Sequence, residues 1–387
     1  MRLNVGVIFG GKSVEHEISI ISAVEAMGYM DENKYNIIPI YIDKDNVWYT
    51  GYHFRDIINY RDEALLKRYA TRVSLVRTKH FFALQTMGVI KRNIKQIDII
   101  LPICHGTFVE DGALQGYLDM LGVPYAGSNV LASAIGQDKV IFKQLLQHNN
   151  IPTPEYVWFY GKEYLKNKKS VLDKISILKY PLYVKPVNLG SSIGITKVLK
   201  EEELNNAIKE AMKFDDKIIV EECIKNVKEV NVSVLGNHET VEASDIEELN
   251  ISDEFFSFKE KYVENYSKIR QKGKKAKPLL SKEMIEDIKK YAIDTFKIIN
   301  ASGVARIDFL IDEKSQRIYV SEINTIPGSL SAYLWLPKKK NEEELIYDLL
   351  KLAMDEKNTE KELVFAFENN LLENFDRLKG KKINNKK

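Results

Sequence analysis

Cysteine, long apolar runs and net charge are all scarce in this sequence, and each absence excludes a class of protein. Only Cys104 and Cys223 occur among 387 residues, which excludes a disulfide scaffold and a cysteine-rich zinc module. No apolar run approaches the roughly 20 residues that a membrane-spanning helix requires. The formal net charge is only +2, so the sequence predicts neither a nucleic acid nor an anionic membrane as a partner.

The length and composition are those of a globular protein with more than one core. An apolar fraction of 44% and a charged fraction of 29% are ordinary for such a protein, and 387 residues are enough for two or three domains. The N-terminus leads directly into a short predicted strand, Leu3–Phe9, and charged residues follow soon after. This stretch is too short for a secretory signal peptide, and we therefore expect a cytoplasmic protein.

Strand and helix patterns alternate in the first third of the chain. Leu3–Phe9 and Tyr35–Ile42 predict strands, with a helix between them. The apolar run Ile97–Ile103 is typical of a strand that is buried on both faces of a parallel sheet. This alternation predicts a doubly wound α/β domain. Residues 52–95 are mixed and basic, and they predict no clear element.

Strand patterns predominate after residue 180, and a long polar loop interrupts them. Asp253–Leu280 carries seven lysines among aromatic residues with little periodicity, and loops of this length inside domains are usually functional or mobile. The other predicted elements are helices at Asp138–Gln147, Ser281–Ile299 and 342–354, strands at Tyr180–Val187, Ile195–Val198, Lys217–Ile224 and Val230–Leu235, and a hairpin of Val304–Ile311 with Arg317–Asn324.

The turn after the first strand matches a phosphate-binding pattern that we reject. Gly6, Gly11, Lys12 and Ser13 satisfy G-x-x-x-x-G-K-[ST]. In that motif the four residues between the glycines wrap a phosphate, but three of them here belong to the predicted strand. A plain strand-to-helix turn is the favoured interpretation, although the N-terminus of the following helix still suits an anion.

The predicted hairpin carries the most informative polar side chains. With its turn centred on Ser315, Asp308 lies opposite Glu322 and Arg306 lies opposite Asn324, all on one face. Opposed carboxylates repel each other unless a cation lies between them, and two carboxylates with an amide oxygen suit Mg²⁺. Arg306 can hold a second anion or a developing oxyanion. The alternative is a solvated polar hairpin end, and a register slip of one residue would remove the argument.

A turn rich in glycine and serine, Gly190–Gly194, joins two predicted strands. Its backbone amides and hydroxyls can cover phosphates as a lid, and Lys185 at the end of the preceding strand supplies a positive charge. The alternatives are an ordinary hairpin turn and, for Lys139, a solvated helix lysine. His105 follows the buried strand, where ligands bind in open α/β sheets. The other histidines have no such context, and we expect them at the surface: His16, His53, His80, His148 and His238.

Six segments form an ordered set that carries a family resemblance. They are Phe9–Ser19, His105–Gly116, Asp138-Lys139, Val184–Gly194, Arg306-Ile307-Asp308 and Glu322–Gly328. In order and spacing over roughly residues 3–355, they resemble the D-alanine–D-alanine ligases of the ATP-grasp superfamily. The resemblance implies an α/β (α+β) ATP-grasp fold in three domains, with the doubly wound parallel sheet first. The implied boundaries are 1–127 for the N-terminal substrate domain, 128–224 for the central lid domain, 225–357 for the catalytic domain and 358–387 for a polar tail.

The resemblance also implies roles for individual side chains. It assigns the metal to Asp308, Glu322 and Asn324, the nucleotide to Lys139, Lys185, Ser192, Glu221, Ile224, Glu229 and Lys261, and the catalytic steps to Glu15, Ser191, Tyr262, Arg306 and Gly328. In this scheme Lys139 and Lys185 hold the α- and β-phosphates and Lys261 reaches the γ-phosphate. Glu221 and Ile224 present the hinge to adenine, and Glu229 holds the ribose.

The amino-acid end of the implied site begins with Glu15, which binds the ammonium of the first amino acid. Glu15, Ser191 and Tyr262 form the family's hydrogen-bonded triad between the domains. Arg306 and the backbone amide of Gly328 stabilise the oxyanion of the tetrahedral intermediate. Without the resemblance, Glu15 is simply an acidic residue that complements the dipole at a helix N-terminus.

The segment implied for the second amino acid departs from the family pattern. The family has a serine that helps to hold the acceptor carboxylate, but Tyr333 stands at that place here, with Ser331 two residues before it. Ser331, Tyr333 and Leu334 are the candidate acceptor residues, and His105 lies near the first amino acid. The segment Lys225–Lys228 is also about one residue longer than usual, close to the implied ribose site.

The sequence therefore predicts an ATP-dependent carboxylate–amine ligase that joins two D-alanines through an acyl phosphate, for peptidoglycan precursor synthesis. The implied cofactors are ATP and Mg²⁺, with Mn²⁺ as a substitute, and a homodimer is expected by resemblance alone. The pair Lys261-Tyr262 matches relatives that use a D-amino acid rather than a hydroxy acid as acceptor. The alternatives are a sibling ligase with D-serine or another acceptor, a dipeptide ligase outside cell-wall synthesis, and a non-catalytic nucleotide-binding scaffold. Retention of the full charged set argues against the scaffold.

Overall fold

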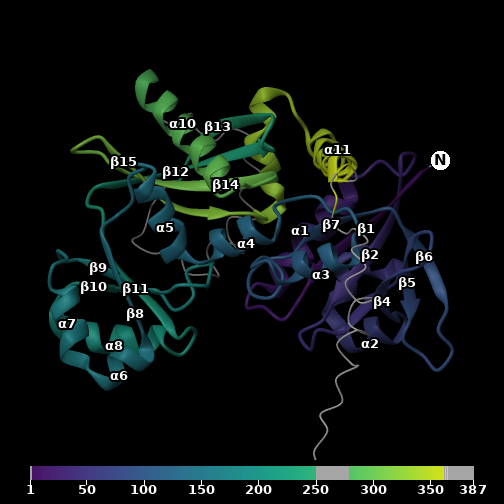
Figure 1. The fold of residues 1–387 in the computed structure, drawn as a ribbon, viewed down its shortest axis with the longest axis horizontal. Coiled ribbons are helices and arrows are strands. Elements are labelled where there is room, and N and C mark those ends of the chain that lie inside the picture. The colour runs from purple at the N-terminus through teal and green to yellow at the C-terminus, as the bar shows by residue number, and fades with distance from the viewer. Residues whose placement is uncertain (1, 250–278, 361, 363, 365–387) are drawn as a thin grey trace, which may run out of the picture.

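The computed structural model describes residues 2–249, 279–360, 362 and 364. Three β-sheets follow one another along the chain, and Figure 1 shows three regions that meet near the centre of the molecule. Lys261, Tyr262 and most of the predicted loop Asp253–Leu280 lie outside the described residues, as does the tail from residue 365. None of the helices in the described part of the chain has the length and apolarity needed to cross a bilayer.

The N-terminal sheet has seven strands in the order β6-β5-β4-β3-β2-β1-β7. Its centre, β2-β1-β7, is parallel, and α1 crosses over between β1 and β2 as predicted. From β2 to β6 every pairing is antiparallel, so the predicted doubly wound parallel sheet is the core of a larger mixed sheet. The strands are β1 (Leu3–Gly10), β2 (Tyr35–Ile42), β3 (Trp48–Thr50), β4 (Thr71–Arg77), β5 (Phe82–Thr86), β6 (Asn93–Ile97) and β7 (Ile99–Ile103).

The antiparallel half of this sheet has a weak sequence signal because its strands bury few residues. β4 buries Val73 and Leu75, and β6 buries Ile97 alone. The predicted strand Ile97–Ile103 is divided at Asp98, whose carboxylate accepts the backbone N–H of Asn4 at 2.8 Å. The helices of this region are α1 (His16–Tyr29), η1 (Tyr52–Arg55), η2 (Ile57–Asp62), α2 (Glu63–Arg68) and α3 (Ala113–Leu121).

The second and third sheets are antiparallel, with the orders β10-β9-β11-β8 and β13-β12-β14-β15. The middle of the chain contains α4 (Val130–Gln137), α5 (Lys139–His148), β8 (Tyr156–Tyr160), α6 (Gly161–Lys166), α7 (Lys168–Ile175), β9 (Leu182–Pro186), β10 (Thr196–Val198), α8 (Glu201–Ala211) and β11 (Lys217–Glu222). The last part contains β12 (Val227–Gly236), β13 (Val241–Leu249), α10 (Lys282–Ile298), β14 (Gly303–Asp312), β15 (Arg317–Asn324), η4 (Gly328–Leu334), η5 (Leu336–Lys338) and α11 (Glu342–Glu360).

Two packing contacts join the regions around the pocket described below. Phe142 and Leu146 of α5 pack into the core of the third sheet with Val230, so α5 lies between the second and third sheets. α11 is six residues longer than predicted and packs through Leu349 with the core of the first sheet, beside β7 in Figure 1. Trp335 is fully buried in the same core and donates Nε1–H to Ser233 at 3.0 Å. The first and third sheets therefore share one core.

Candidate active site

The hairpin β14–β15 pairs Asp308 with Glu322 and Arg306 with Asn324, as the sequence predicted. The route to this register differs from the prediction. Pairing next to the turn is centred between residues 314 and 315, which by itself would place Ser321 opposite Asp308. A β-bulge takes up Ser321 and restores the opposition of the two carboxylates. The pairing of Asp308 with Glu322 thus depends on the bulge within the strand and not on the position of the turn.

Arg306 and Asp308 form a bidentate pair at the centre of this hairpin. Arg306 donates Nε–H at 2.6 Å and an Nη2 hydrogen at 2.8 Å to the two oxygens of Asp308. Asn324 donates to Asp308 at 3.4 Å, and Asn231 of β12 lies opposite Asp308 on the other side. Across the hairpin, Glu322 lies 3.8 Å from the ammonium of Lys139. This face of the hairpin therefore carries two carboxylates, Asp308 and Glu322, each with a cation beside it.

The donor set on this face fits magnesium. Asp308 and Glu322 offer carboxylate oxygens and Asn324 an amide oxygen, and Mg²⁺ typically uses one or two carboxylates together with substrate phosphates and water. Within residues 2–249 and 279–360, no three His, Cys, Asp or Glu side chains gather as a metal cage. The residues thus suit a metal that is shared with a nucleotide.

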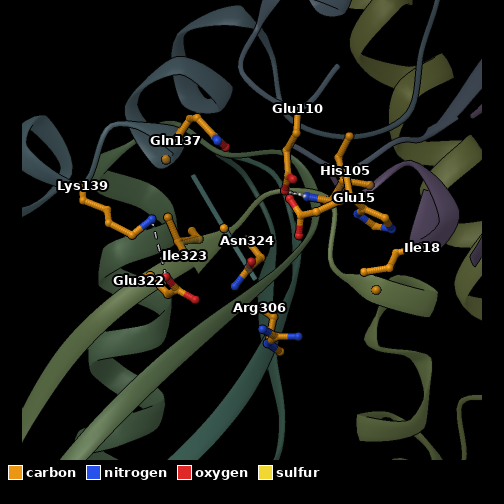
Figure 2. Close-up of a pocket in the computed structure, with 14 residues that line it drawn as sticks. Glu15, Ile18, His105, Glu110, Gln137, Lys139, Arg306, Glu322, Ile323 and Asn324 are labelled. Carbon is orange, nitrogen blue, oxygen red and sulfur yellow. Dashed lines mark hydrogen bonds and ion pairs between the residues drawn. The ribbon is translucent and has the colours of Figure 1, made fainter. Parts of the chain in front are cut away.

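A pocket lies where the three regions meet, and it contains seven of the predicted site residues. Figure 2 shows Lys139 and Glu322 at one side, Glu15, His105 and Glu110 at the other, and Arg306 and Asn324 between them. The complete lining is Glu15, Ile18, His105, Glu110, Gly136, Gln137, Lys139, Gly190, Arg306, Glu322, Ile323, Asn324, Ile326 and Gly328. Side chains from separate sheets thus converge on one cavity.

The glycine-rich turn between β9 and β10 is anchored against this pocket. Gln137 donates to the carbonyl of Asn188 at 2.6 Å, and Lys139 donates to the carbonyl of Leu189 at 2.7 Å. Ser191 hydrogen-bonds Glu15, as predicted for two members of the triad, while the third member lies outside the described residues. Ser191 and Ser192 have φ of 54° and 59°, left-handed values that are uncommon outside glycine. The turn is thus held over Glu15.

The nucleotide side of the predicted site contains a buried carboxylate between two lysines. Lys185 Nζ lies 2.5 Å from Glu221 Oε2, and Lys143 Nζ lies 3.1 Å from Glu221 Oε1. Burial alone would raise the pKa of Glu221, but the two ammonium charges lower it to about 2. Burial lowers the pKa of Lys185, but Glu221, Glu322 and Glu229 raise it above the usual value. Lys143 had no sequence signal beyond its place on a helix.

The remaining residues predicted for the nucleotide lie nearby along the chain. Ile224 is half-buried just after β11, and Glu229 on β12 pairs across to Leu310 of β14. The charge of Glu229 contributes to the raised pKa of Lys185, after that of Glu221 and Glu322. Lys261 lies outside the described residues.

The start of α1 is held in place by an unexpected histidine. His16 is buried, with Nδ1 2.7 Å from the carbonyl of Gly11 and Nε2 3.0 Å from the hydroxyl of Tyr41. The prediction that His16 lies at the surface is therefore wrong, because a turn with positive φ at Gly11 folds the helix start back onto β1 and β2. This packing sets the position of Glu15 at the helix N-terminus.

His105 is also buried, and it lines the pocket as predicted. The hydroxyl of Ser19 accepts the backbone N–H of His105 at 2.9 Å, and the hydroxyl of Ser22 lies 3.2 Å from His105 Nε2. Burial lowers the pKa of His105 to about 4, so the ring is neutral at physiological pH. The ring is therefore a hydrogen-bonding group of the amino-acid side and carries no charge.

Glu110 is a pocket residue that sequence reasoning missed. Its two oxygens accept the backbone N–H of Gly106 at 3.1 Å and of Ile326 at 3.0 Å. Burial and the nearby charge of Glu15 raise the pKa of Glu110 to about 8. The signal was present in the segment His105–Gly116, but burial cannot be read from an acidic residue in a polar turn. Glu110 ties the first sheet to the segment that leads into Gly328.

The predicted acceptor segment adopts a left-handed turn. Ser329, Leu330 and Ser331 have φ of 46°, 54° and 49° in succession, which is costly for residues other than glycine. Ser329 donates its backbone N–H to Ser22 at 3.1 Å and its hydroxyl to Glu25 at 2.7 Å, so α1 holds the turn. The pocket lining includes Gly328, while Ser331, Tyr333 and Leu334 are absent from it.

Comparison with known proteins decides the family. A model of the D-ala D-ala ligase N-terminus matches residues 4–128, and a model of the D-ala D-ala ligase C-terminus matches residues 145–350. The chain belongs to the D-alanine–D-alanine ligase family. The D-alanine–D-alanine ligase of Thermosipho melanesiensis is 39% identical over 360 residues, covering 91% of this chain and 94% of that protein.

Two solved structures share the fold over nearly the whole chain. The D-alanine-D-alanine ligase from Coxiella burnetii has a TM-score of 0.78 and 29% identity, and covers 98% of this chain and 99% of its own. The VanG D-Ala:D-Ser ligase from Enterococcus faecalis has a TM-score of 0.77 and 30% identity, covering 91% and 100%. The predictions of an ATP-grasp fold and of an ATP-dependent ligase of this family are thus confirmed.

Proposed function

We propose that this protein uses ATP and Mg²⁺ to join two D-alanines in the cytoplasm, as a step in peptidoglycan precursor synthesis. The observation that carries the proposal is the hairpin register, which opposes Asp308 to Glu322 and Arg306 to Asn324. Arg306, Glu322 and Asn324 line one pocket together with Glu15. We further propose that residues 1–127, 128–224 and 225–357 act as the three domains of the ligase, and that the protein is a homodimer.

The metal and nucleotide side comprises the hairpin and the two lysines beside it. Asp308, Glu322 and Asn324 hold the Mg²⁺, for which Mn²⁺ can substitute because both prefer oxygen ligands. A metal ion held by these residues would neutralise charge on the phosphates. Lys139 and Lys185 hold the α- and β-phosphates. Ser192 covers them, Glu221 and Ile224 face the base, Glu229 holds the ribose, and Lys261 reaches the γ-phosphate.

The reaction runs in two steps between the nucleotide side and the amino-acid side. Glu15 holds the ammonium of the first D-alanine beside His105, and a carboxylate oxygen of that D-alanine attacks the γ-phosphorus while ADP leaves. The amine of the second D-alanine then attacks the carbonyl carbon of the acyl phosphate and loses a proton, and phosphate leaves. Arg306 and the N–H of Gly328 stabilise the oxyanion between these events.

Water must be kept from the acyl phosphate, because hydrolysis would waste it. The turn that contains Ser191 is anchored to Glu15 by the Ser191 hydroxyl, and to the side chains of Gln137 and Lys139, which donate to carbonyls just before Gly190. This anchoring supports its role as a lid. Tyr262 completes the triad with Glu15 and Ser191 in this proposal.

A second candidate is a ligase of the same chemistry with another acceptor, such as D-serine. Two observations favour keeping it. Tyr333 occupies the place of the family's carboxylate-binding serine, and a left-handed turn at Ser329–Ser331 shapes the approach to it. In addition, a structurally similar protein is a D-Ala:D-Ser ligase. Ser331, Tyr333 and Leu334 are the residues that would discriminate.

A phosphate-release screen tests the proposal and separates the two candidates. ATP and Mg²⁺ are supplied with D-alanine alone, and with D-alanine plus D-serine, D-lactate or a panel of L-amino acids. We expect release with D-alanine alone, and dipeptide in equal amount by mass spectrometry. Release that needs a second, different amino acid favours the alternative acceptor. Release without any amino acid contradicts both candidates and indicates an ATPase.

A further inference from the structure

Helix α5 and strand β11 are joined by two ion pairs of opposite orientation, one partly buried and one fully buried. At one end Asp138, the N-cap of α5, lies 2.7 Å from Lys217 at the start of β11. At the other end Lys143 of α5 lies 3.1 Å from Glu221 of β11. The second pair continues into the nucleotide side, because Lys185 contacts the other oxygen of Glu221 at 2.5 Å.

The first of these pairs has a structural explanation that the second lacks. Asp138 also accepts the backbone N–H groups of Val140 and Ile141, so it caps α5 while it pairs with Lys217. Lys143 is only 1% exposed, on a helix whose neighbouring residues pack into apolar cores. Glu221 keeps Lys185 as a counter-ion whether or not Lys143 is present, so its charge is compensated by one buried cation already. Charge compensation of Glu221 alone therefore does not account for a second cation at this position.

The surroundings of Lys143 connect it to the nucleotide. Its electrostatic neighbours are Glu221, Lys185 and Lys139, all of which the proposed function assigns to ATP. Among the described residues, Nζ of Lys143 and the facing oxygen of Glu221 make no hydrogen bond of good geometry, so attraction between charges holds them together. Burial lowers the pKa of Lys143, which shows how unfavourable the charge is there.

We propose that Lys143 is a positioning residue of the nucleotide site: it holds one oxygen of Glu221, so that the other oxygen fixes Lys185 where the phosphates of ATP bind. The inference rests on the proposed function, because that function assigns Lys185 to the phosphates. Without Lys143, Glu221 has a single cation partner and is free to turn toward it. Lys185 is then drawn away from the phosphates, and affinity for ATP falls while the amino-acid side is unaffected.

The test measures nucleotide binding and turnover separately. Isothermal titration with a non-hydrolysable ATP analogue and Mg²⁺ gives the Kd, and phosphate release gives the KM for D-alanine. We expect Lys143→Met to raise the Kd by about tenfold and to change the KM for D-alanine by less than roughly twofold. Lys143→Gln, a shorter neutral variant, should show the same split and keeps the test available if the first variant does not fold.

The second ion pair supplies a matched control. Lys217→Met removes a buried lysine from the same two elements, and it should lower the Tm while changing the Kd by less than roughly twofold. In a Glu221→Gln background, Lys143→Met should change the Kd by less than roughly twofold, because its effect passes through Glu221.

Three results overturn the inference. They are an unchanged Kd in folded Lys143→Met, a loss of equal size in the Glu221→Gln background, and a parallel rise in the Kd and the KM for D-alanine. Failure of the proposed function looks different, because a wild-type protein that binds the analogue but does not consume D-alanine refutes the ligase while the binding test of Lys143 proceeds. A wild-type protein that does not bind the analogue refutes both.

Discussion

Two buried glutamates on either side of the pocket have opposite charge preferences. On the nucleotide side, the two lysines around Glu221 lower its pKa to about 2 although burial alone would raise it. On the amino-acid side, burial and the charge of Glu15 raise the pKa of Glu110 to about 8, and two backbone N–H groups offset only part of this rise. Both carboxyl groups are almost inaccessible to water. Their neighbours, and not their depth, decide which one is charged.

This difference matches what each side must bind. The nucleotide side needs fixed cations for phosphates, and the charge of Glu221 favours the charged forms of Lys185 and Lys143 against the effect of burial. The amino-acid side must accept an ammonium group, and Glu15 offers a carboxylate for it, while the raised pKa of Glu110 favours the neutral form of that carboxyl group. The two sides meet at the hairpin, where Arg306 and Glu322 face the same pocket.

The largest expected effect comes from the hairpin where the two sides meet. Glu322→Gln should reduce turnover by more than about 100-fold, because it removes a proposed metal ligand and a counter-charge for Lys139. Asp312→Asn, on the same hairpin but at its exposed turn, is the matched control and should keep activity near wild type. Circular dichroism checks that both variants fold. Wild-type turnover in Glu322→Gln would mean that the metal assignment is wrong.

The next effect tests the charged glutamate. Glu221→Gln leaves Lys143 and Lys185 without a counter-ion in a buried site, which costs about 3 kcal/mol in the free energy of unfolding. The Kd for the ATP analogue should rise by more than about tenfold, with a smaller change in the KM for D-alanine. Urea unfolding and titration calorimetry measure the two quantities. Equal changes in the Kd for the ATP analogue and the KM for D-alanine would mean that Glu221 does not act on the nucleotide side alone.

A smaller effect tests the protonated glutamate through pH. Because the pKa of Glu110 is about 8 in the folded protein and 4.5 in the reference state, the folded state binds more protons between these values. The free energy of unfolding should therefore fall as pH rises from about 5 to about 8. Glu110→Gln should flatten this slope, as measured by urea unfolding across the range. An identical slope in the variant would show that other groups cause it.

The smallest expected effect concerns the acceptor. Tyr333→Ser restores the family's usual residue and should shift the preference between D-alanine and D-serine as acceptor by roughly three- to tenfold. The Kd for the ATP analogue should not change, because the substitution lies away from the nucleotide side. Competition between the two acceptors, with products counted by mass spectrometry, measures the ratio. An unchanged ratio would place the acceptor pocket elsewhere.

The sequence predicted the hairpin well because alternation along a strand is a local property. Asp308, Glu322, Arg306 and Asn324 lie on one face at a spacing of two, so their opposition survived an error of half a residue in the turn. The bulge at Ser321 could not be foreseen, because nothing in the composition of the strand marks it. The parallel centre of the first sheet was predictable for the same reason, from its continuous apolar runs.

Residues whose role depends on burial could not be predicted. Lys143 and Glu110 look like ordinary surface residues in sequence, and His16 was assigned to the surface, yet all three are buried by packing between distant segments. The antiparallel half of the first sheet was missed because strands such as β6 expose most of their side chains. The local sequence pattern identifies the strands that carry the proposed site residues. The buried residues that support them, such as Lys143 and His16, can be identified only from the three-dimensional structure.

The most direct test of carboxyl activation at this site is an isotope transfer. D-alanine labelled with ¹⁸O in both carboxylate oxygens is incubated with ATP and Mg²⁺, and the released phosphate is examined by mass spectrometry. If the carboxylate attacks the γ-phosphorus, each phosphate released should carry one ¹⁸O atom, and the dipeptide should lose one. Unlabelled phosphate formed alongside dipeptide would contradict an acyl phosphate at this site.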